Sequence, residues 1–403
     1  MFQQVYRIIG LLVCVHILLA THTHAQVLTD GPTPLPIVKI GFFAPLYLDS
    51  AFPAGKYTYA REQFPKYTLQ GLSFVQGSLM ALKQYPSASF RTEAFFFDTK
   101  ADSASLTTLI QNGALDTLGL QLIIGSVREK DFTALADYSK SHQIPFISAT
   151  YPNDGGVTKN PFLFIANSTL RTHCESVLSY HLQNNSSLPI LHVRKAGSQE
   201  DRIEQYIHAY AKQDASPLLS IKTLRLDSNF VALNASLDSS RPANVVFVGS
   251  MDEKYVTKLV TYMGSLPAAY NIFLIGMPNW ESFGVFGSKA PVLKNEPTVH
   301  FTASYHGSNR DSICKNMSIR YDEQYKGSPD EFAMRGFETT YAFSRLLWAF
   351  PADFTQHIND NIFSLTHTYQ FMPVLNKAGE IDYYENKKLL FLKRKKGVTS
   401  HGW

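Results

Sequence analysis

The feature that most constrains the fold is the alternation of short apolar segments with segments of helical periodicity as far as residue 290. The apolar segments lack the alternation of apolar and polar residues that marks a strand with one solvated face, so both faces of each strand are expected to be buried. Helices between such strands are typical of parallel sheets with right-handed crossovers. The expected strands cover residues 37–46, 92–98, 120–125, 144–150, 188–193, 243–249 and 271–276, and the expected helices between them cover 69–84, 103–115, 129–142, 199–212 and 252–263.

A chain of 403 residues with this many strands exceeds one small sheet, and nothing in the pattern indicates a closed barrel. The sequence therefore predicts an α/β protein with two doubly wound, mainly parallel sheets. A polar break with two glycines and an Asn-Pro pair follows the strand at 144–150, and the apolar run Phe162 to Ala166 is expected to start the second sheet. A second crossing is expected near residues 295–307, before two helices and two closing strands. The predicted lobes are 36–160 with 300–350, and 161–299 with 351–403.

Residues 1–25 are expected to be a cleaved secretory signal. A basic residue precedes an apolar run from Ile8 to Ala20, and small residues follow, which predicts cleavage after Ala25. The run is short for a bilayer span, although a retained anchor stays an alternative. Cys14 lacks the small preceding residue expected of a lipidated cysteine. The sequence thus predicts a periplasmic or secreted protein.

Charge and cysteine content exclude some classes of partner. Without the one arginine of the signal, 36 of the 37 basic residues remain against 33 acidic ones, a net charge of +3, so no nucleic-acid partner is expected. The basic excess lies in KKLLFLKRKK at 387–396, which is either a solvated strand or tail, or a contact for an anionic surface. Cys174 and Cys314 would permit one disulfide, but their spacing does not decide whether they pair.

Four segments together resemble the type 1 periplasmic binding proteins, which include branched-chain amino acid binding proteins and receptor ligand-binding lobes. They are VKIGFFAPL, LQGLSFVQGSLMAL, LIIGSVREKDFTALADYSKSHQIPFISATYP and PDEFAMRGFETTYAFSRLL. The resemblance extends over residues 37–395. It implies two α/β lobes joined by three crossings, with a hinge and a solute-binding cleft between the lobes.

The sequence departs from the amino acid binders after Gly125. That family often has small hydroxyl residues there to hold a ligand carboxylate, whereas this chain has Ser126, Val127 and Arg128. Arg128 is suited to bind a carboxylate or phosphate with two hydrogen bonds, or to pair with an acidic neighbour on the surface. The segment 48–66 is long and aromatic, and it is expected either to cover a ligand ring or to pack locally.

Ligands of open parallel sheets bind beyond the carboxyl ends of the strands. We therefore expect stacking from Tyr151 and Trp280, hydrogen-bond acceptance by Asp49 and Asp154, and orientation of the ligand by Ser250. An ordinary turn at 153–156 and a buried Trp280 are the structural alternatives. The whole expected set is Tyr47, Asp49, Ser126, Arg128, Thr150, Tyr151, Asn153, Asp154, Ser168, Ser250, Met251, Asn279 and Trp280.

The sequence contains no G-x-S-x-G, H-E-x-x-H, C-x-x-C or phosphate-loop motif, so neither catalysis nor a cofactor or metal is expected. The favoured function is capture of a small polar solute, such as one that resembles an amino acid, for uptake or sensing, with a membrane permease or a sensor as partner. The alternative is a cell-envelope interaction module on the same fold, such as a cell-wall synthase activator. An enzyme without a recognisable motif is the third hypothesis.

Overall fold

The computed structural model describes residues 36–59, 64–84, 90–101, 105–212, 219–290, 292–296, 298–307 and 312–403. The predicted signal at 1–25 lies outside these residues. The chain divides into two compact units, unit 1 with Met1–Ala149 and Asn309–Thr366, and unit 2 with Thr150–Ser308 and His367–Trp403. The boundaries predicted from the sequence, after residues 160, 299 and 350, stay a prediction.

Two sheets of seven strands form the framework, and most of their pairings are parallel, as predicted. The strand orders are β11-β12-β5-β4-β3-β1-β2 and β14-β13-β10-β9-β8-β6-β7. The strands of the first sheet are β1 (Ile37–Ala44), β2 (Arg91–Asp98), β3 (Leu122–Gly125), β4 (Phe146–Ser148), β5 (Leu163–Ile165), β11 (Phe371–Leu375) and β12 (Ile381–Asn386). Those of the second are β6 (Ile190–Arg194), β7 (Ile221–Arg225), β8 (Asn244–Val248), β9 (Ile272–Ile275), β10 (Val299–Ala303), β13 (Leu390–Lys395) and β14 (Val398–His401).

Unit 1 contains β1 to β4, and its helices are α2 (Leu48–Ala51), α3 (Lys66–Gln84), α4 (Leu106–Gln111), α5 (Glu129–His142), α10 (Ser312–Tyr325) and α11 (Glu331–Ala349). Every residue of β3 and β4 is buried, which explains why these strands read as continuous apolar runs. Phe42, Phe74, Phe132 and Phe337 are fully buried and bring strands and helices into one core.

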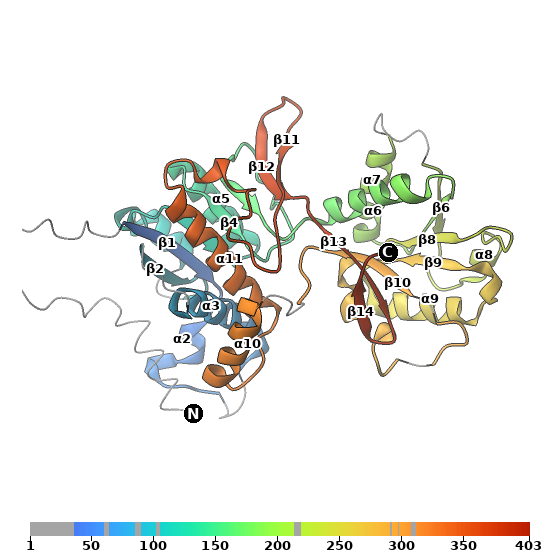
Figure 1. Cartoon of the computed structure of the whole chain (residues 1–403), viewed down its shortest axis with the longest axis horizontal. Coiled ribbons are helices and arrows are strands. Elements are labelled where there is room, and N and C mark those ends of the chain that lie inside the picture. Colours follow the sequence, from blue (N-terminus) through green and yellow to red (C-terminus); the bar gives the residue numbers. More distant parts are fainter. Residues whose placement is uncertain are drawn as a thin grey trace, which may run out of the picture. The chain divides into compact units, whose positions relative to one another are not determined.

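The helices α3 and α11 lie against each other with backbone contact (Figure 1). A Cβ atom at Gly77 would lie 1.8 Å from the carbonyl oxygen of Ala333, and one at Gly336 would lie 2.2 Å from that of Phe74. Only glycine leaves room for this approach. Ser73 Oγ of α3 also donates to the carboxylate of Asp330, the N-cap residue of α11, at 2.8 Å.

Unit 2 contains β5 to β14, and its helices are α6 (Leu170–Asn185), α7 (Ser198–Ala211), α8 (Val231–Asn234) and α9 (Glu253–Ser265). The parallel strands β7-β6-β8-β9-β10 are extended by the antiparallel hairpin β13–β14, visible at the red end of the chain in Figure 1. The basic segment 387–396 is therefore largely an inner strand, with Leu392 fully buried and lysines at its ends.

The expectation that Phe162–Ala166 starts the second sheet is wrong. The strand in this run, β5, belongs to the first sheet and pairs in parallel with β12. A short run that is buried on both faces fits either sheet, so its composition does not decide between them. The amide of Asn160 donates to the carbonyl oxygen of Asp382 at 2.9 Å and fixes the preceding loop to β12.

Neither of the described cysteines forms a disulfide, and both are buried, Cys174 in α6 and Cys314 in α10. Burial raises the pKa of the Cys174 thiol, so this group stays protonated and behaves as an apolar core residue. None of the described helices is long and apolar enough to cross a membrane.

Candidate functional site

The loop after β1 in unit 1 is organised by Asp98, the last residue of β2. Its carboxylate accepts hydrogen bonds from the amides of Leu46 (2.8 Å), Tyr47 (3.1 Å) and Leu48 (2.8 Å). Tyr47 has a φ of 56°, a left-handed conformation that this clamp helps to hold. The Asp98 carboxylate thus fixes the backbone of the loop that follows β1 at this edge of the sheet.

Ser126 follows β3 directly beside this loop, because β1 and β3 are paired with Phe43 opposite Gly125. Its side chain is fully buried, and its Oγ accepts a hydrogen bond of 3.4 Å from Gln70 Nε2 of α3. Tyr47 and Ser126 therefore follow neighbouring strands at the same edge of the sheet. Arg128 is the exposed N-cap residue of α5, and Asp49 lies in the first turn of α2.

The aromatic residues of segment 48–66 contact one another. The Tyr57 ring lies 5.3 Å from that of Phe52, 5.8 Å from that of Tyr59 and 5.7 Å from that of Phe64. Tyr67 makes an edge contact with Tyr47 at 4.8 Å. These contacts favour local packing, the second of the two interpretations left open by the sequence.

In unit 2, the polar break after residue 150 uses its side chains to form a turn. Asn153 Oδ1 accepts from the amide of Gly155 at 3.2 Å, and Asp154 Oδ1 accepts from that of Gly156 at 3.0 Å. Both are Asx turns. The second oxygen of Asp154 accepts from the Tyr383 hydroxyl at 3.0 Å. These bonds support the turn interpretation of this segment.

The neighbouring Thr150 is buried and Tyr151 is half-buried. The carbonyl oxygen of Thr150 accepts a hydrogen bond from Asn167 Nδ2 at 2.7 Å.

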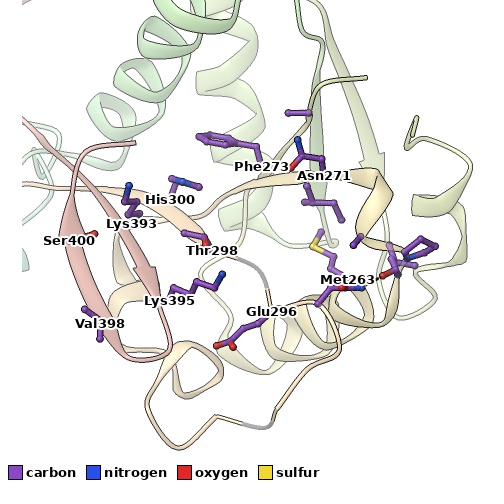
Figure 2. A pocket seen from close by; sticks show the side chains of 16 residues that line it. Met263, Asn271, Phe273, Glu296, Thr298, His300, Lys393, Lys395, Val398 and Ser400 are labelled. Carbon is purple, nitrogen blue, oxygen red and sulfur yellow. Dashed lines mark hydrogen bonds between the residues drawn. The ribbon is translucent and has the colours of Figure 1, made fainter. Parts of the chain in front are cut away.

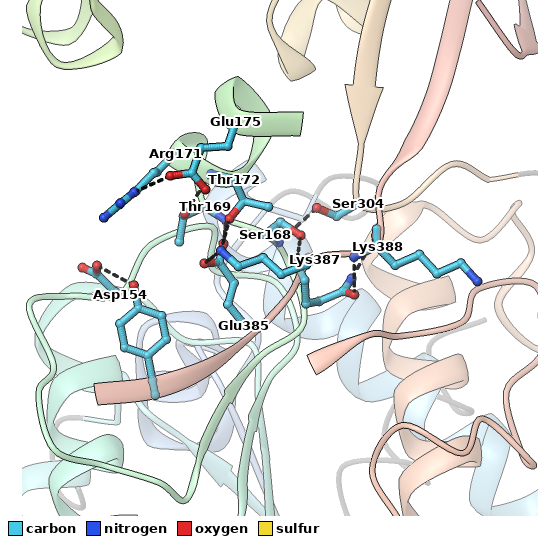
Figure 3. Close-up of polar contacts among 12 residues, drawn as sticks. Asp154, Ser168, Thr169, Arg171, Thr172, Glu175, Ser304, Glu385, Lys387 and Lys388 are labelled. Atoms are coloured by element: carbon cyan, nitrogen blue, oxygen red, sulfur yellow. Dashed lines mark hydrogen bonds and ion pairs between the residues drawn. The ribbon is translucent and has the colours of Figure 1, made fainter. Parts of the chain in front are cut away.

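Ser168, also expected at the site, joins three chain segments of unit 2 (Figure 3). Its amide donates to Ser304 Oγ at 3.0 Å, and its hydroxyl donates to the carbonyl oxygen of Asn386 at 2.5 Å. Asn386 Nδ2 in turn donates to the carbonyl oxygen of Ala166 at 3.2 Å. Ser168 is fully buried, so its polar groups are used to connect these segments.

An ion pair between a buried carboxylate and a partly exposed lysine lies next to Ser168. Glu385 is 2% exposed, and one oxygen accepts from the amide of Thr169 at 2.7 Å while the other lies 2.7 Å from Lys387 Nζ. The same ammonium donates to Thr172 Oγ1 at 2.5 Å. Both charges are therefore compensated, and Figure 3 shows Lys387 directed toward Glu385 and α6 while Lys388 extends away from this network.

A polar cluster at strand carboxyl ends lies after β6, β8 and β9 in unit 2. Ser250 is fully buried after β8, and its hydroxyl donates to Glu200 Oε1 of α7 at 2.7 Å. Glu200 is 4% exposed. Asn279, after β9, donates to the carbonyl oxygen of Met251 at 3.1 Å, but its own Oδ1 is buried without a hydrogen-bond partner among the described residues. A buried acceptor without a partner lacks a donor that the described residues do not supply.

A charged pair stands beside this cluster. Lys195, directly after β6, lies 2.6 Å from Asp252 Oδ2, and Asp252 Oδ1 caps α9 by accepting from the amide of Tyr255 at 3.1 Å. The hydrogen bond from Lys195 lowers the pKa of Asp252, and the same bond raises the pKa of Lys195. The two groups are partly exposed, so they present a cation and an anion side by side to solvent.

Trp280 does not offer the expected stacking surface. It is fully buried, its Nε1 donates to the carbonyl oxygen of Ser250 at 2.8 Å, and its ring packs against Phe283 and Phe286. A Cβ atom at Gly276 would lie 2.2 Å from this ring. The indole therefore supports the loop after β8 from the core side.

The structure brings together four of the expected residues, Ser250, Met251, Asn279 and Trp280, because β8 and β9 are neighbours. Sequence reasoning missed Lys195, Glu200 and Asp252. Lys195 follows the apolar strand at 188–193, so the strand-end rule applied to that strand would have found it. Glu200 gives no comparable signal, since it lies inside the first turn of a helix.

Solved structures share this fold. A putative branched-chain amino acid ABC transporter protein from Rhodospirillum rubrum aligns with a TM-score of 0.65 at 12% identity, covering 91% of this chain and 100% of that one. A branched-chain amino acid ABC transporter periplasmic ligand-binding protein from Burkholderia xenovorans aligns with a TM-score of 0.59 at 13% identity, covering 91% and 94%. The chain has the type 1 periplasmic binding protein fold.

An ABC transporter substrate-binding protein from Desulfitobacterium hafniense shares the periplasmic binding protein fold too, with a TM-score of 0.57 at 12% identity and coverage of 91% and 100%. No family profile matches the chain, and no curated protein sequence matches it. The resemblance seen in the sequence is thus confirmed at the level of the fold. Within the described residues, no group of three His, Cys, Asp or Glu side chains is arranged to hold a metal ion.

Proposed function

We propose that this chain is an exported solute-binding protein that captures a small polar, amino acid-like molecule for uptake or sensing and catalyses no reaction. The observation that carries the proposal is the cluster at the carboxyl ends of β6, β8 and β9, where Lys195, Asp252 and the unused Oδ1 of Asn279 are found together. A cation beside an anion suits a zwitterion, whose carboxylate and ammonium groups need opposite partners. Strand carboxyl ends are where ligands of such sheets bind.

The fold supports the same proposal. Two of the solved structures with this fold are described as a periplasmic ligand-binding protein and a substrate-binding protein of ABC transporters. Under the proposal, the partner of this chain is a membrane permease or a sensor. Export with cleavage after Ala25 places it in the periplasm or outside the cell, and intact-mass measurement of the exported protein tests this part: a chain that begins at Met1 contradicts it.

The main experiment is a thermal-shift screen of the chain from Gln26 onward against the common amino acids and related small polar molecules. A ligand at one hundred times its Kd stabilises the folded state by about 2.7 kcal/mol. Each hit is then titrated calorimetrically into the wild type and into Lys195→Gln.

The matched control is Lys254→Gln, which removes the same charge from an exposed position of α9. We expect Lys195→Gln to weaken binding by on the order of tenfold and Lys254→Gln to leave it unchanged. Equal affinities for all three proteins would move the site away from Lys195. A screen without any stabilising solute would favour the envelope interaction module.

A further inference from the structure

A cavity of about 640 Å³ lies at the amino ends of β9 and β10 in unit 2, away from the carboxyl ends that carry the proposed solute site. Its walls come from the end of α9, the starts of β9 and β10, the loop at 292–296 and the hairpin β13–β14, as Figure 2 shows. Pockets that hold small organic molecules have volumes of about 300–1,000 Å³. The cavity is therefore large enough for one such molecule.

The sheet register places the polar lining on one face. His300 of β10 is opposite Lys393 of β13, and Lys393 is opposite Ser400 of β14. Lys395 is opposite Val398 in the same hairpin. Residues two apart in a strand point to the same face with Cα atoms about 7 Å apart, so both lysines face the cavity and can reach one ligand group.

The charges of this lining do not cancel. Neither Lys393 nor Lys395 makes a hydrogen bond or an ion pair with any described part of the chain, and both line the cavity. The acidic residue of the lining, Glu296, lies 3.7 Å from Lys396 Nζ. Burial lowers the pKa of His300 to about 4, so its imidazole is neutral at pH 7. Two uncompensated ammonium groups give the cavity a preference for anions.

Opposite the lysines the lining is apolar. Met263, Leu266 and Pro267 form the α9 side, and Figure 2 shows the side chain of Lys395 extending from β13 toward that side. Phe273 stacks on His300 with ring centroids 4.0 Å apart and forms part of the floor. An apolar wall facing two cations is suited to a ligand with an apolar body and a charged end.

We propose that this cavity is a second binding site, specific for a small organic anion with an aromatic or aliphatic body, such as an apolar carboxylate. The ammonium groups of Lys393 and Lys395 bind the carboxylate, with Ser400 as a further donor, and the body lies against Phe273 and the α9 side. This site is independent of the solute site proposed above, because the two share no residue.

The test uses 2-naphthoate and its neutral analogue 2-naphthylmethanol as probes, each titrated calorimetrically into the chain from Gln26 onward. We expect 2-naphthoate to bind and the alcohol to bind weaker by on the order of tenfold, since the alcohol cannot form charge-assisted bonds with the lysines. Equal affinity of the two probes, or no binding of 2-naphthoate at about 1 mM, would overturn the proposal.

Variants then locate the binding. We expect Lys393→Gln/Lys395→Gln to weaken 2-naphthoate binding by on the order of tenfold, whereas Lys254→Gln/Lys258→Gln, which removes two charges from exposed positions of α9 outside the lining, leaves it within about twofold. Val398→Trp keeps both charges but fills the cavity from an exposed edge strand, and it should also weaken binding. Circular dichroism establishes that the variants are folded. Unchanged affinity in both the double variant and Val398→Trp would place the probe elsewhere and refute the site.

Discussion

Replacement of Trp280 by phenylalanine tests whether this ring supports the core or serves a ligand. The indole is fully buried, and its N–H donates to the carbonyl oxygen of Ser250 at 2.8 Å. A buried carbonyl that loses its donor costs about 1–3 kcal/mol. The smaller ring adds about 1–2 kcal/mol of lost burial. We therefore expect Trp280→Phe to lower the free energy of unfolding of unit 2 by about 2–5 kcal/mol.

Trp280→Ala would leave a large cavity, which costs about 3–5 kcal/mol of the free energy of unfolding. Together with the lost hydrogen bond, this cost approaches the whole stability of a domain. The phenylalanine variant is for this reason the informative one.

The assay is urea unfolding followed by far-UV circular dichroism and by tryptophan fluorescence. The chain has three tryptophans, so Trp280→Phe leaves Trp348 to report on unit 1 and Trp403 to report on unit 2. We expect the Trp403 signal to change at lower urea and the Trp348 signal to change less.

Trp348→Phe is the matched control. This ring is half-buried, stacks on Phe90 at 5.1 Å, and its nitrogen forms no hydrogen bond with the described residues. We expect it to cost about 1–2 kcal/mol, without the contribution of a hydrogen bond. If the two substitutions lower the stability equally, the Trp280 hydrogen bond contributes nothing. If Trp280→Phe instead weakens solute binding without lowering stability, the ring serves the ligand after all.

Two further perturbations test the packing and the protonation of the core. Gly77→Ala should lower the free energy of unfolding of unit 1 by about 1–3 kcal/mol or more, because the new Cβ would lie 1.8 Å from the carbonyl oxygen of Ala333. Urea unfolding measures this loss. The control is Gly327→Ala, whose Cβ would have no atom within 4 Å. Burial lowers the pKa of His192 from 6.5 to about 4. Between pH 6.5 and pH 4 the unfolded chain therefore binds more protons than the folded chain does. The free energy of unfolding should fall as the pH drops through this range, by up to about 1.4 kcal/mol per pH unit. Unfolding midpoints at pH 7 and 5 should differ less in His192→Asn, and an unchanged difference would contradict the assignment.

The sequence predicted the strands that are buried on both faces, and it also predicted the half-buried β2, whose three consecutive phenylalanines form an apolar run. It missed β7. β3, β4 and β8 are fully buried, and their unbroken apolar runs are distinctive. β7 is half-exposed, with lysine and arginine among its five residues, so it carries no such run. An edge strand needs only one buried face, and its side chains adapt to solvent.

The candidate site was predictable where it depends on local order along the chain. The strand-end rule found Ser250 and Asn279 because each follows an apolar strand. It gave Trp280 the wrong role, since a residue five positions after a strand can turn into the core as readily as toward solvent. The bonds of Ser168 join residues 136 and 218 positions apart, and no local pattern encodes such partners.

The glycine contact between α3 and α11 also has a consequence for the order in which the protein acquires its structure. Ser73 and Asp330, which connect the two helices, are 257 residues apart in sequence, and the larger segment of unit 2, Thr150–Ser308, lies between them. During synthesis, α3 leaves the ribosome long before α11, the helix that packs against it. The face of α3 that contacts α11 therefore stays uncovered while the residues between the two helices are synthesised. Contacts of such long sequence separation are slow to form and leave intermediates prone to aggregation. A nascent chain that ends before residue 331 already contains β1 to β4, which are the strands of unit 1. We nevertheless expect such a chain to bind chaperones, because it lacks α11.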